Sequence, residues 1–440
     1  MSGVVKKGTT IFTGKPFVFL LYSEHRTTRC DNCLKSGKLS RCSGCQYVYY
    51  CDRNCQKESW PIHKIECACL KKAIIVVDMV RLLARVIIKL NQGGADEKSY
   101  YTEKNFRKFK DLMSNYSDIK IDMKRQRDFI CLSGMLFQFL DEALMPNFVD
   151  LMGIYGRICT NYFNILDTKL NTIAVGLYLG ASVIDHSCKP NVAAVFEGTT
   201  IIIRTLTDLP SLDWSKITIS YIELLDSNKD RREKLHNLYY FWCNCERCKK
   251  EEPMAKAATC PNLSCESPCS IETDKCKKCS ARISIKFKKT FQEVSALTAS
   301  HLKGMEYLND LSKILISKVC LMKQKNVMYK FNIQHLQTLQ MAYTASTNLN
   351  CFKDAELYSK ALLPGYLLYY GEVHPSTGLL YFTMAEIQLR LQKPNEALQL
   401  LDKAGTILKI THGDEHSLVK DKLNFLIYIA TMMLRNTRSM

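Results

Sequence analysis

The chain has 440 residues, 47% of them hydrophobic and 24% charged, which is enough for two or three folded domains. No charged-then-apolar leader opens the sequence, and no apolar run reaches the ~18 residues of a membrane-spanning helix. We therefore expect neither secretion nor membrane insertion. The formal charge of +18 suggests acidic partners such as nucleic acid, although a solvated basic surface is the simpler explanation.

The 21 cysteines carry the strongest signal in the composition. In a chain without a secretory leader they should be reduced thiols, so clustered cysteines indicate metal ligands more than disulfides. Residues 1–29, which precede the first cluster, alternate polar and apolar side chains and predict short strands.

The most specific motif lies in residues 30–67, where eight potential ligands fall in pairs: Cys30 and Cys33, Cys42 and Cys45, Cys51 and Cys55, His63 and Cys67. Their number predicts two zinc sites. A segment this short cannot bury enough apolar area to fold without metal. The i, i+4 spacing of the last pair places both ligands on one face of a helix.

After this segment, residues 74–94 show a helical apolar stripe that ends at Gly93-Gly94, and residues 95–160 continue as a mostly helical insert. A buried strand then leads into a tight turn within Val175–Asn191, which carries Asp185-His186-Ser187-Cys188. Two β-like runs follow, and Tyr221 is expected to end a further strand beside the Asp185 turn.

Two further zinc sites are predicted downstream. Cys243, Cys245 and Cys248 are one ligand short of a tetrahedral site, and Cys188 is the natural fourth, so a metal would join the 185–188 turn to residues 239–248. The spacing of Cys260 and Cys265 with Cys276 and Cys279 is typical of a zinc ribbon. Cys269 lies between these pairs and is an alternative ligand to Cys265.

The C-terminal third has neither cysteine clusters nor strand patterns. Periodic helices are expected there, separated by breaks at Asn348-Leu-Asn350, Pro364-Gly365, His374-Pro375 and Lys393-Pro394. The segments that begin at Phe352 and Lys393 share a small-residue pattern. This repeat predicts paired helices in a degenerate tetratricopeptide-like array.

The motif G-L-Y in residues 176–178, followed by D-H-S-C-K-P-N at 185–191 and then by C-x-C-x2-C, resembles the SET and MYND domain (SMYD) family of lysine methyltransferases. The resemblance covers nearly the whole chain and is closest to the third vertebrate type. It implies interleaved pairing in the finger: Cys30, Cys33, Cys51 and Cys55 on one zinc, and Cys42, Cys45, His63 and Cys67 on the other.

The implied fold is an α+β multidomain protein with a β-rich SET core, split by the MYND finger and a helical insert. The domains expected are SET N-terminal strands (1–29), a MYND finger (30–67), a helical insert (68–160), the core SET domain (161–225), a zinc-bound post-SET segment with the ribbon (226–285), and an all-α TPR-like domain (286–440).

The implied activity is transfer of a methyl group from S-adenosylmethionine to a lysine side chain of a histone or non-histone protein. By resemblance, Tyr239 and Tyr221 are the catalytic pair. The residues expected to hold the cofactor are Asn115, Asn161, Ser182, Asp185, His186 and Phe241; for Asn115 the alternative is a helix C-cap. The zinc ions are expected to be structural.

Two positions depart from the family pattern. Asp185 stands where the family has Asn, so two N–H donors are replaced by a charge. Residues 1–8 match only the exit of the family's Gly-x-Gly loop, so either this is a shortened form, or its start was mis-assigned, or the cofactor site lacks one wall. The alternative function is therefore an inactive or weakly active SET/MYND scaffold.

The expected partners follow from the same resemblance. The MYND finger would dock a Pro-rich peptide, and basic side chains around it offer nucleic acid as a weaker alternative. The helical domain would shield the substrate groove or dock a chaperone or regulator. We expect a monomer in the cytoplasm and nucleus.

Overall fold

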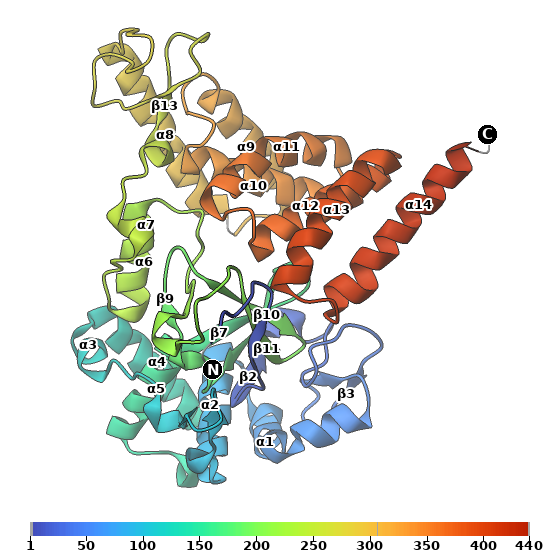
Figure 1. Ribbon diagram of the computed structural model, residues 1–440. Coiled ribbons are helices and arrows are strands. Elements are labelled where there is room, and N and C mark those ends of the chain that lie inside the picture. The colour runs from blue at the N-terminus through green and yellow to red at the C-terminus, as the bar shows by residue number, and fades with distance from the viewer. Residues whose placement is uncertain (1–2, 306, 439–440) are drawn as a thin grey trace. The chain divides into compact units, whose positions relative to one another are not determined.

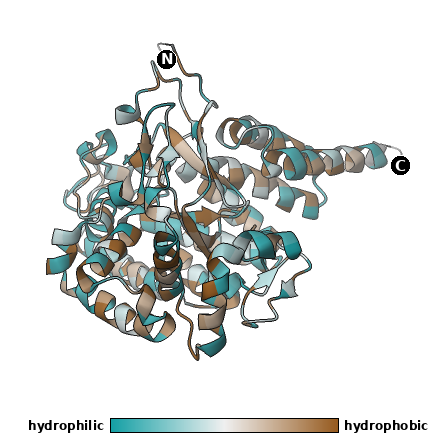
Figure 2. Ribbon diagram, turned by 90° about the horizontal axis from the view of Figure 1, so that it is seen from below, coloured by the Kyte–Doolittle hydropathy of each residue, from teal (hydrophilic) through white to brown (hydrophobic). Residues whose placement is uncertain are grey.

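The computed structural model describes residues 3–305 and 307–438, which divide into two compact units (Figure 1). The first unit comprises residues up to 186 together with 191–219 and 235–241, and the second comprises 187–190, 220–234 and the residues from 242 onward. Each unit has its own buried apolar cluster. Most helices carry both hydrophobic and hydrophilic residues, as elements with one buried face should (Figure 2).

The first unit is built on strands that are distant in sequence. One antiparallel sheet has the order β1 (Thr10–Gly14), β11 (Thr200–Thr205), β10 (Val192–Glu197), and a second has the order β2 (Val18–Leu21), β8 (Thr172–Leu177), β7 (Tyr162–Leu166). The strand predicted to run into the Asp185 turn is short, because β8 ends at Leu177. A parallel pair, β9 (Asp185–His186) with β12 (Thr218–Ile219), sets the Asp185 turn in register.

The finger and helices are inserted between β2 and β7. The finger contains β3 (Ser40–Arg41), β4 (Tyr49–Tyr50) and α1 (Arg53–Lys72). The rest of the insert consists of α2 (Asp78–Asn91), the hairpin β5 (Ser99–Tyr100) and β6 (Phe106–Arg107), α3 (Tyr116–Ile121), α4 (Met123–Phe139) and α5 (Phe148–Asn161). Helix α2 is buried along most of its length, in the core of the unit.

The helix expected from residue 74 begins at Asp78 instead. Ile74 and Ile75 are 99% and 80% exposed, and the chain is extended at Ala73, where α1 gives way to the link before α2. The apolar stripe overestimated the length of the helix at its N-terminal end, because hydrophobic spacing cannot show where one helix ends and the next begins.

The second unit contains the ribbon strands and successive helices. These elements are α7 (Glu246–Lys249), β13 (Ala258–Thr259), β14 (Pro268–Cys269), α8 (Ile285–Met305), α9 (Asp310–Gln324), α10 (Ile333–Asn348), α11 (Phe352–Tyr369), α12 (Pro375–Arg390), α13 (Pro394–Thr411), a π-helical turn (Leu418–Leu423) and α14 (Asn424–Arg438). Helix α6 (Asn228–Tyr239) runs from residues of the second unit into residues of the first. Among the described helices, none combines the length and hydropathy needed to cross a bilayer.

The helices pack in neighbouring pairs, α10 with α11 and α12 with α13. The two similar sequence segments fall in α11 and α13, the second helix of each pair. The predicted break at Pro364-Gly365 is wrong, since Pro364 lies inside α11. A Cβ on Gly365 would stand 2.4 Å from Cδ2 of Leu336. This close packing of α11 on α10 compensates for the hydrogen bond lost at Pro364.

Candidate functional site

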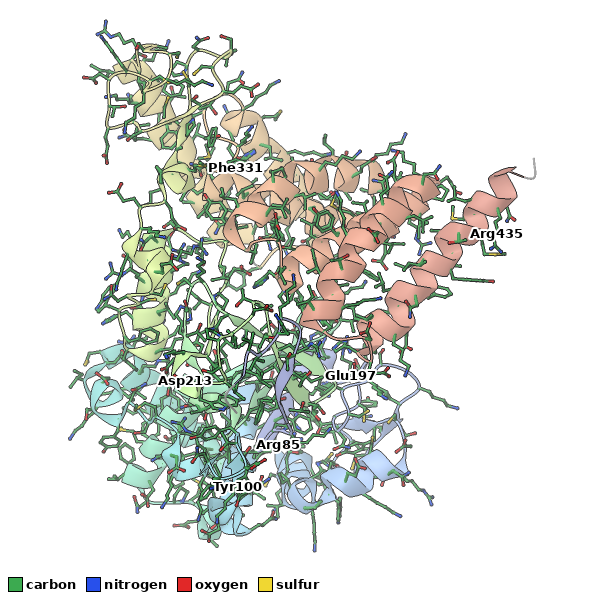
Figure 3. The ribbon with its side chains drawn as sticks, viewed as in Figure 1. Arg85, Tyr100, Glu197, Asp213, Phe331 and Arg435 are labelled. Atoms are coloured by element: carbon green, nitrogen blue, oxygen red, sulfur yellow. The ribbon has the colours of Figure 1, made fainter. Side chains whose placement is uncertain are left out.

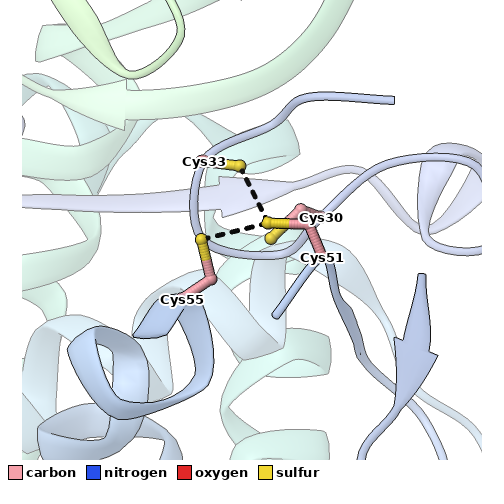
Figure 4. Close-up of side chains that lie close together, drawn as sticks. All are labelled: Cys30, Cys33, Cys51 and Cys55. Carbon is pink, nitrogen blue, oxygen red and sulfur yellow. Dashed lines mark hydrogen bonds between the residues drawn. The ribbon is translucent and has the colours of Figure 1, made fainter. Parts of the chain in front are cut away.

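The finger brings its eight ligands into two groups of four. Within each group the ligand atoms lie within 4.8 Å of one another, and the groups are those of the interleaved pairing. Figure 4 shows Cys30, Cys33, Cys51 and Cys55 converging from two loops and the first turn of α1. The Cys33 and Cys51 Sγ atoms are 3.7 Å apart. Tetrahedral zinc with bonds of ~2.3 Å to sulfur needs separations of about 3.8 Å. The donor set therefore fits zinc.

His63 in the second group has a fixed ring orientation. Its Nε2 faces Cys45 Sγ at 3.8 Å, whereas its Nδ1 lies 3.2 Å from Glu66 Oε2. His63 and Cys67 lie on one face of α1, as the spacing indicated. A carboxylate that accepts from the far nitrogen holds the imidazole in the tautomer that can bind metal. Glu66 therefore orients a zinc ligand.

Glu66 belongs to a buried network of four charged side chains. Its Oε1 accepts from Arg81 Nε and Arg85 Nε, both at 2.9 Å, and Asp31 Oδ2 accepts from Arg85 at 2.5 Å. All four are at most 5% exposed. Arg85, labelled in Figure 3, also donates to the carbonyl of Phe19 in β2 at 2.9 Å. The network thus joins the finger to the core of the first unit.

The charges in this network stabilise one another. Burial alone would raise the pKa of the Glu66 carboxyl, but Arg81 and Arg85 hold that pKa well below its usual range. Sequence inspection missed this cluster. Its signal was two arginines four residues apart, Arg81 and Arg85, inside an otherwise apolar helix.

Two further cysteine groups lie in the second unit. Cys188 joins Cys243, Cys245 and Cys248, and Cys260 joins Cys265, Cys276 and Cys279. In the ribbon group, Cys265 rather than Cys269 lies among the ligand atoms; Cys269 is in β14, paired with Ala258.

A buried arginine supports the group that contains Cys188. Arg231 donates to Cys248 Sγ at 3.9 Å and to Glu252 Oε2 at 2.8 Å. Because four thiolates around Zn²⁺ carry net negative charge, a guanidinium beside them is stabilising. Arg231, which is fully buried, is a second residue that the sequence did not single out.

Asn161, at the end of α5, is held against the turn that contains Asn115. Its Nδ2 donates to the carbonyl of Met113 at 2.7 Å. Helix α5 can approach so closely because residue 156 is glycine: a Cβ there would lie 2.0 Å from the Ser114 carbonyl oxygen. Asn115 has left-handed backbone (φ 44°) and directly precedes α3, so the alternative C-cap interpretation is wrong.

Around the Asp185 turn, three predicted residues form an aromatic cluster. The rings of His186 and Phe241 are 6.0 Å apart, and those of Tyr239 and Phe241 are 6.5 Å apart. Burial raises the pKa of the Tyr239 hydroxyl, and the nearby Tyr162 adds to the rise. Tyr162 directly follows Asn161 in the chain and begins β7. Asp185 has an exposed side chain.

Tyr240, between Tyr239 and Phe241, has a left-handed backbone conformation. It has φ 62° and caps the end of α6, its N–H donating to the carbonyl of His236 at 2.9 Å. A left-handed tyrosine costs roughly 1–2 kcal/mol. Its hydroxyl donates to Asp122 Oδ2 at 3.1 Å, which compensates part of that cost, and burial raises its pKa to about 12. The left-handed conformation of Tyr240 turns the chain between Tyr239 and Phe241.

The structure places two of the predicted site residues, Ser182 and Tyr221, differently from the prediction. The Ser182 hydroxyl donates to the Leu179 carbonyl at 2.6 Å and accepts from Arg107 at 3.1 Å, so its polar capacity is used within the protein. Tyr221 does not end a strand, because β12 stops at Ile219. It belongs to the second unit, whereas Tyr239 belongs to the first.

The fold and the donor sets define a mixed α/β protein with a double zinc finger, two further four-cysteine groups and a half-buried aromatic cluster. Residues 30–67 match the MYND finger family model. The chain is 30% identical to mouse histone-lysine N-methyltransferase SMYD3, over 96% of this chain and 92% of that protein.

Two other relatives span similar lengths. Identity is 28% to histone-lysine N-methyltransferase ASHR1 of Arabidopsis thaliana, over 94% of this chain and 89% of that protein. It is 25% to N-lysine methyltransferase SMYD2-A of Xenopus laevis, over 94% and 92%. The chain belongs to the SMYD family of lysine methyltransferases.

Proposed function

We propose that this chain transfers a methyl group from S-adenosylmethionine to a lysine side chain of a histone or non-histone protein. The observation that carries the proposal is the half-buried aromatic cluster of Tyr239, Phe241 and His186, in which burial raises the pKa of the Tyr239 hydroxyl. S-adenosylmethionine, when bound, would supply the methyl group. Asn115, Asn161, Asp185 and His186 would hold it.

The chemistry requires a neutral amine. A free lysine ammonium titrates ~3 units above pH 7, so removing its proton costs about 4–5 kcal/mol. Burial raises the pKa of Tyr239, which means that charge is disfavoured at this place. The same desolvation would lower the pKa of an entering lysine. By resemblance, Tyr239 and Tyr221 would then orient the amine, and Phe241 would line its path.

No general base is needed if the amine enters neutral and the two reactants are aligned in a dry site. The zinc ions would be structural in this scheme. Their fully thiolate or thiolate–histidine donor sets offer no open position of the kind that catalytic zinc keeps.

The first test is calorimetric titration of the zinc-replete chain with S-adenosylmethionine, beside the variant Asp185→Asn. Micromolar binding by the wild type, followed by transfer of labelled methyl to histone or peptide lysines, is the expected result. Tighter binding by Asp185→Asn would mean that the family's amide donates to the cofactor. No binding by either folded protein would contradict the proposal.

Asp185 also favours a second candidate, a scaffold without turnover. An amide donor is replaced there by an exposed carboxylate. The scaffold would bind a Pro-rich peptide at the MYND finger and a chaperone or regulator at a TPR-like helical lobe. Peptide binding that persists in a chain unable to bind S-adenosylmethionine would support it.

A further inference from the structure

The zinc ribbon carries an unusual concentration of positive charge. Residues 275–289 contain seven cations and no carboxylate. The structure leaves six of them exposed, and we call these the basic ribbon surface: Lys275, Lys277, Lys278, Arg282, Lys286 and Lys289. The seventh, Lys288, is paired with Asp274 at 2.8 Å.

The six cations lack carboxylate partners within 4.0 Å among the described residues. Some exposed lysines elsewhere in the second unit do have them: Lys250 pairs with Glu246 at 2.7 Å and Lys318 with Asp354 at 2.7 Å. The charge of the ribbon is therefore directed to solvent.

The backbone holds these cations close together. Lys275 and Arg282 are directly opposite each other in an antiparallel bridge. Between them, Cys276 and Ser280 close the turn, with Cys276 N–H donating to the Ala281 carbonyl at 2.9 Å. Like charges directly opposite each other destabilise a strand pair. The ribbon thus fixes a repulsive arrangement that an anionic ligand would relieve.

A zinc bound by four thiolates carries a net charge of about −2, so part of the basic surface offsets the metal site. This explanation is incomplete, because six unpaired cations exceed that charge. Glu266 and Glu272, the remaining acidic residues of the ribbon, do not pair with any of them within 4.0 Å.

We propose that the basic ribbon surface binds the phosphate backbone of a nucleic acid. Five of its six cations are lysines, which act as compact point charges suited to phosphate contacts that carry no sequence information. An acidic protein is the competing partner. The proposal is independent of methyl transfer and places the interaction on the ribbon rather than on the MYND finger.

The test uses the full zinc-replete chain and labelled random-sequence duplexes, one of DNA and one of RNA, followed by fluorescence anisotropy from about 50 to about 200 mM salt. The ribbon variant combines Lys275→Gln, Lys277→Gln, Lys278→Gln and Arg282→Gln. We expect its affinity to fall at least about tenfold and its salt slope to shrink by up to about 3.6, since four contacts are removed and each phosphate contact contributes about 0.9.

The matched control removes the same charge from the finger through Lys35→Gln, Lys38→Gln, Lys57→Gln and Lys64→Gln, all exposed positions. It should retain the wild-type slope. Equal losses in both variants, or no duplex binding by the wild type, would overturn the proposal.

Two further measurements separate the alternatives. Zinc content of the ribbon variant should equal that of the wild type; loss of one zinc would assign the cations to metal retention instead. Poly-glutamate that displaces the duplex at equal charge concentration would assign the surface to an acidic protein. Preference for the DNA or the RNA duplex identifies which nucleic acid is bound.

Discussion

At the scale of single residues, Tyr239 is the most direct test of the proposed chemistry. Its ring lies 6.5 Å from that of Phe241, and its hydroxyl is buried. We expect Tyr239→Phe to lower methyl transfer at least about 100-fold, which corresponds to about 2.7 kcal/mol of transition-state stabilisation. Binding of S-adenosylmethionine by calorimetry should change little.

The control for this prediction is Tyr428→Phe, which removes an exposed hydroxyl from α14. Its methyl-transfer rate should equal that of the wild type. A Tyr239→Phe variant that turns over normally would contradict the role assigned to this hydroxyl.

Glu66 tests the link between zinc and the core. In Glu66→Gln one negative charge is lost from a buried group of two arginines and two carboxylates. Breaking such a network costs about 3–5 kcal/mol, and loss of a carboxylate behind a zinc-binding histidine weakens metal binding about 10–100-fold. We expect one zinc to be released first when a chelator is titrated.

The comparison variant is Glu58→Gln, an exposed position on the same helix α1. It should release zinc at wild-type chelator concentrations. If Glu66→Gln behaves in the same way, the carboxylate does not secure the ligand His63.

At the scale of elements, α5 must approach the 113–115 turn closely. In Gly156→Ala the new methyl would lie 2.0 Å from the Ser114 carbonyl, so the turn must move. Asn161 would then lose its bond to the Met113 carbonyl. We expect affinity for S-adenosylmethionine, measured by calorimetry, to fall at least about tenfold, because two residues proposed to bind the cofactor, Asn115 and Asn161, are displaced together.

Gly153→Ala provides the matched change on the same helix. Its Cβ would meet only the flexible end of Arg157 at 3.2 Å. Helix propensity favours alanine by about 0.5–1 kcal/mol, so this variant should be at least as stable as the wild type and should bind the cofactor equally. Equal binding by both variants would show that the turn does not shape the site.

At the scale of the whole molecule, we expect the folded structure of the finger and the ribbon to depend on zinc, and that of the helical core not to. The finger and the ribbon have clusters composed largely of cysteines, whereas the core around α10–α12 is formed by apolar and aromatic side chains. We expect about four zinc per chain by elemental analysis. Complete chelation should abolish hydrogen-exchange protection in residues 30–72 and 257–283.

Protection in α10–α13 should survive the same treatment, because these helices contribute no zinc ligands. Two zinc per chain would remove the sites at Cys188 and in the ribbon. Loss of protection throughout the described residues would mean that the helical core depends on metal.

Local sequence patterns predicted the zinc-ligand pairs of the finger and the starts of two C-terminal helices. The ligand pairs of the finger were readable because spacing alone brings Cys30 near Cys33 and places His63 and Cys67 on one helical face, whereas the interleaved grouping of the pairs came from the resemblance to the MYND finger. Helix ends at His374-Pro375 and Lys393-Pro394 were readable because proline favours the first turn of a helix. These features depend on neighbours in the chain.

Contacts between segments that are distant in the sequence were decided only by the tertiary structure. Pro364 stays helical because α11 packs on α10, Gly156 is required because Ser114 touches it, and the charges of Arg81 and Arg85 are satisfied by carboxylates of the finger. Cys265 rather than Cys269 lies among the four ligand atoms of the ribbon, while Cys269 pairs with Ala258 in the β13–β14 hairpin. Apart from the two arginines inside the apolar helix α2, these choices leave no local signature, because each depends on a packing partner that the chain provides elsewhere.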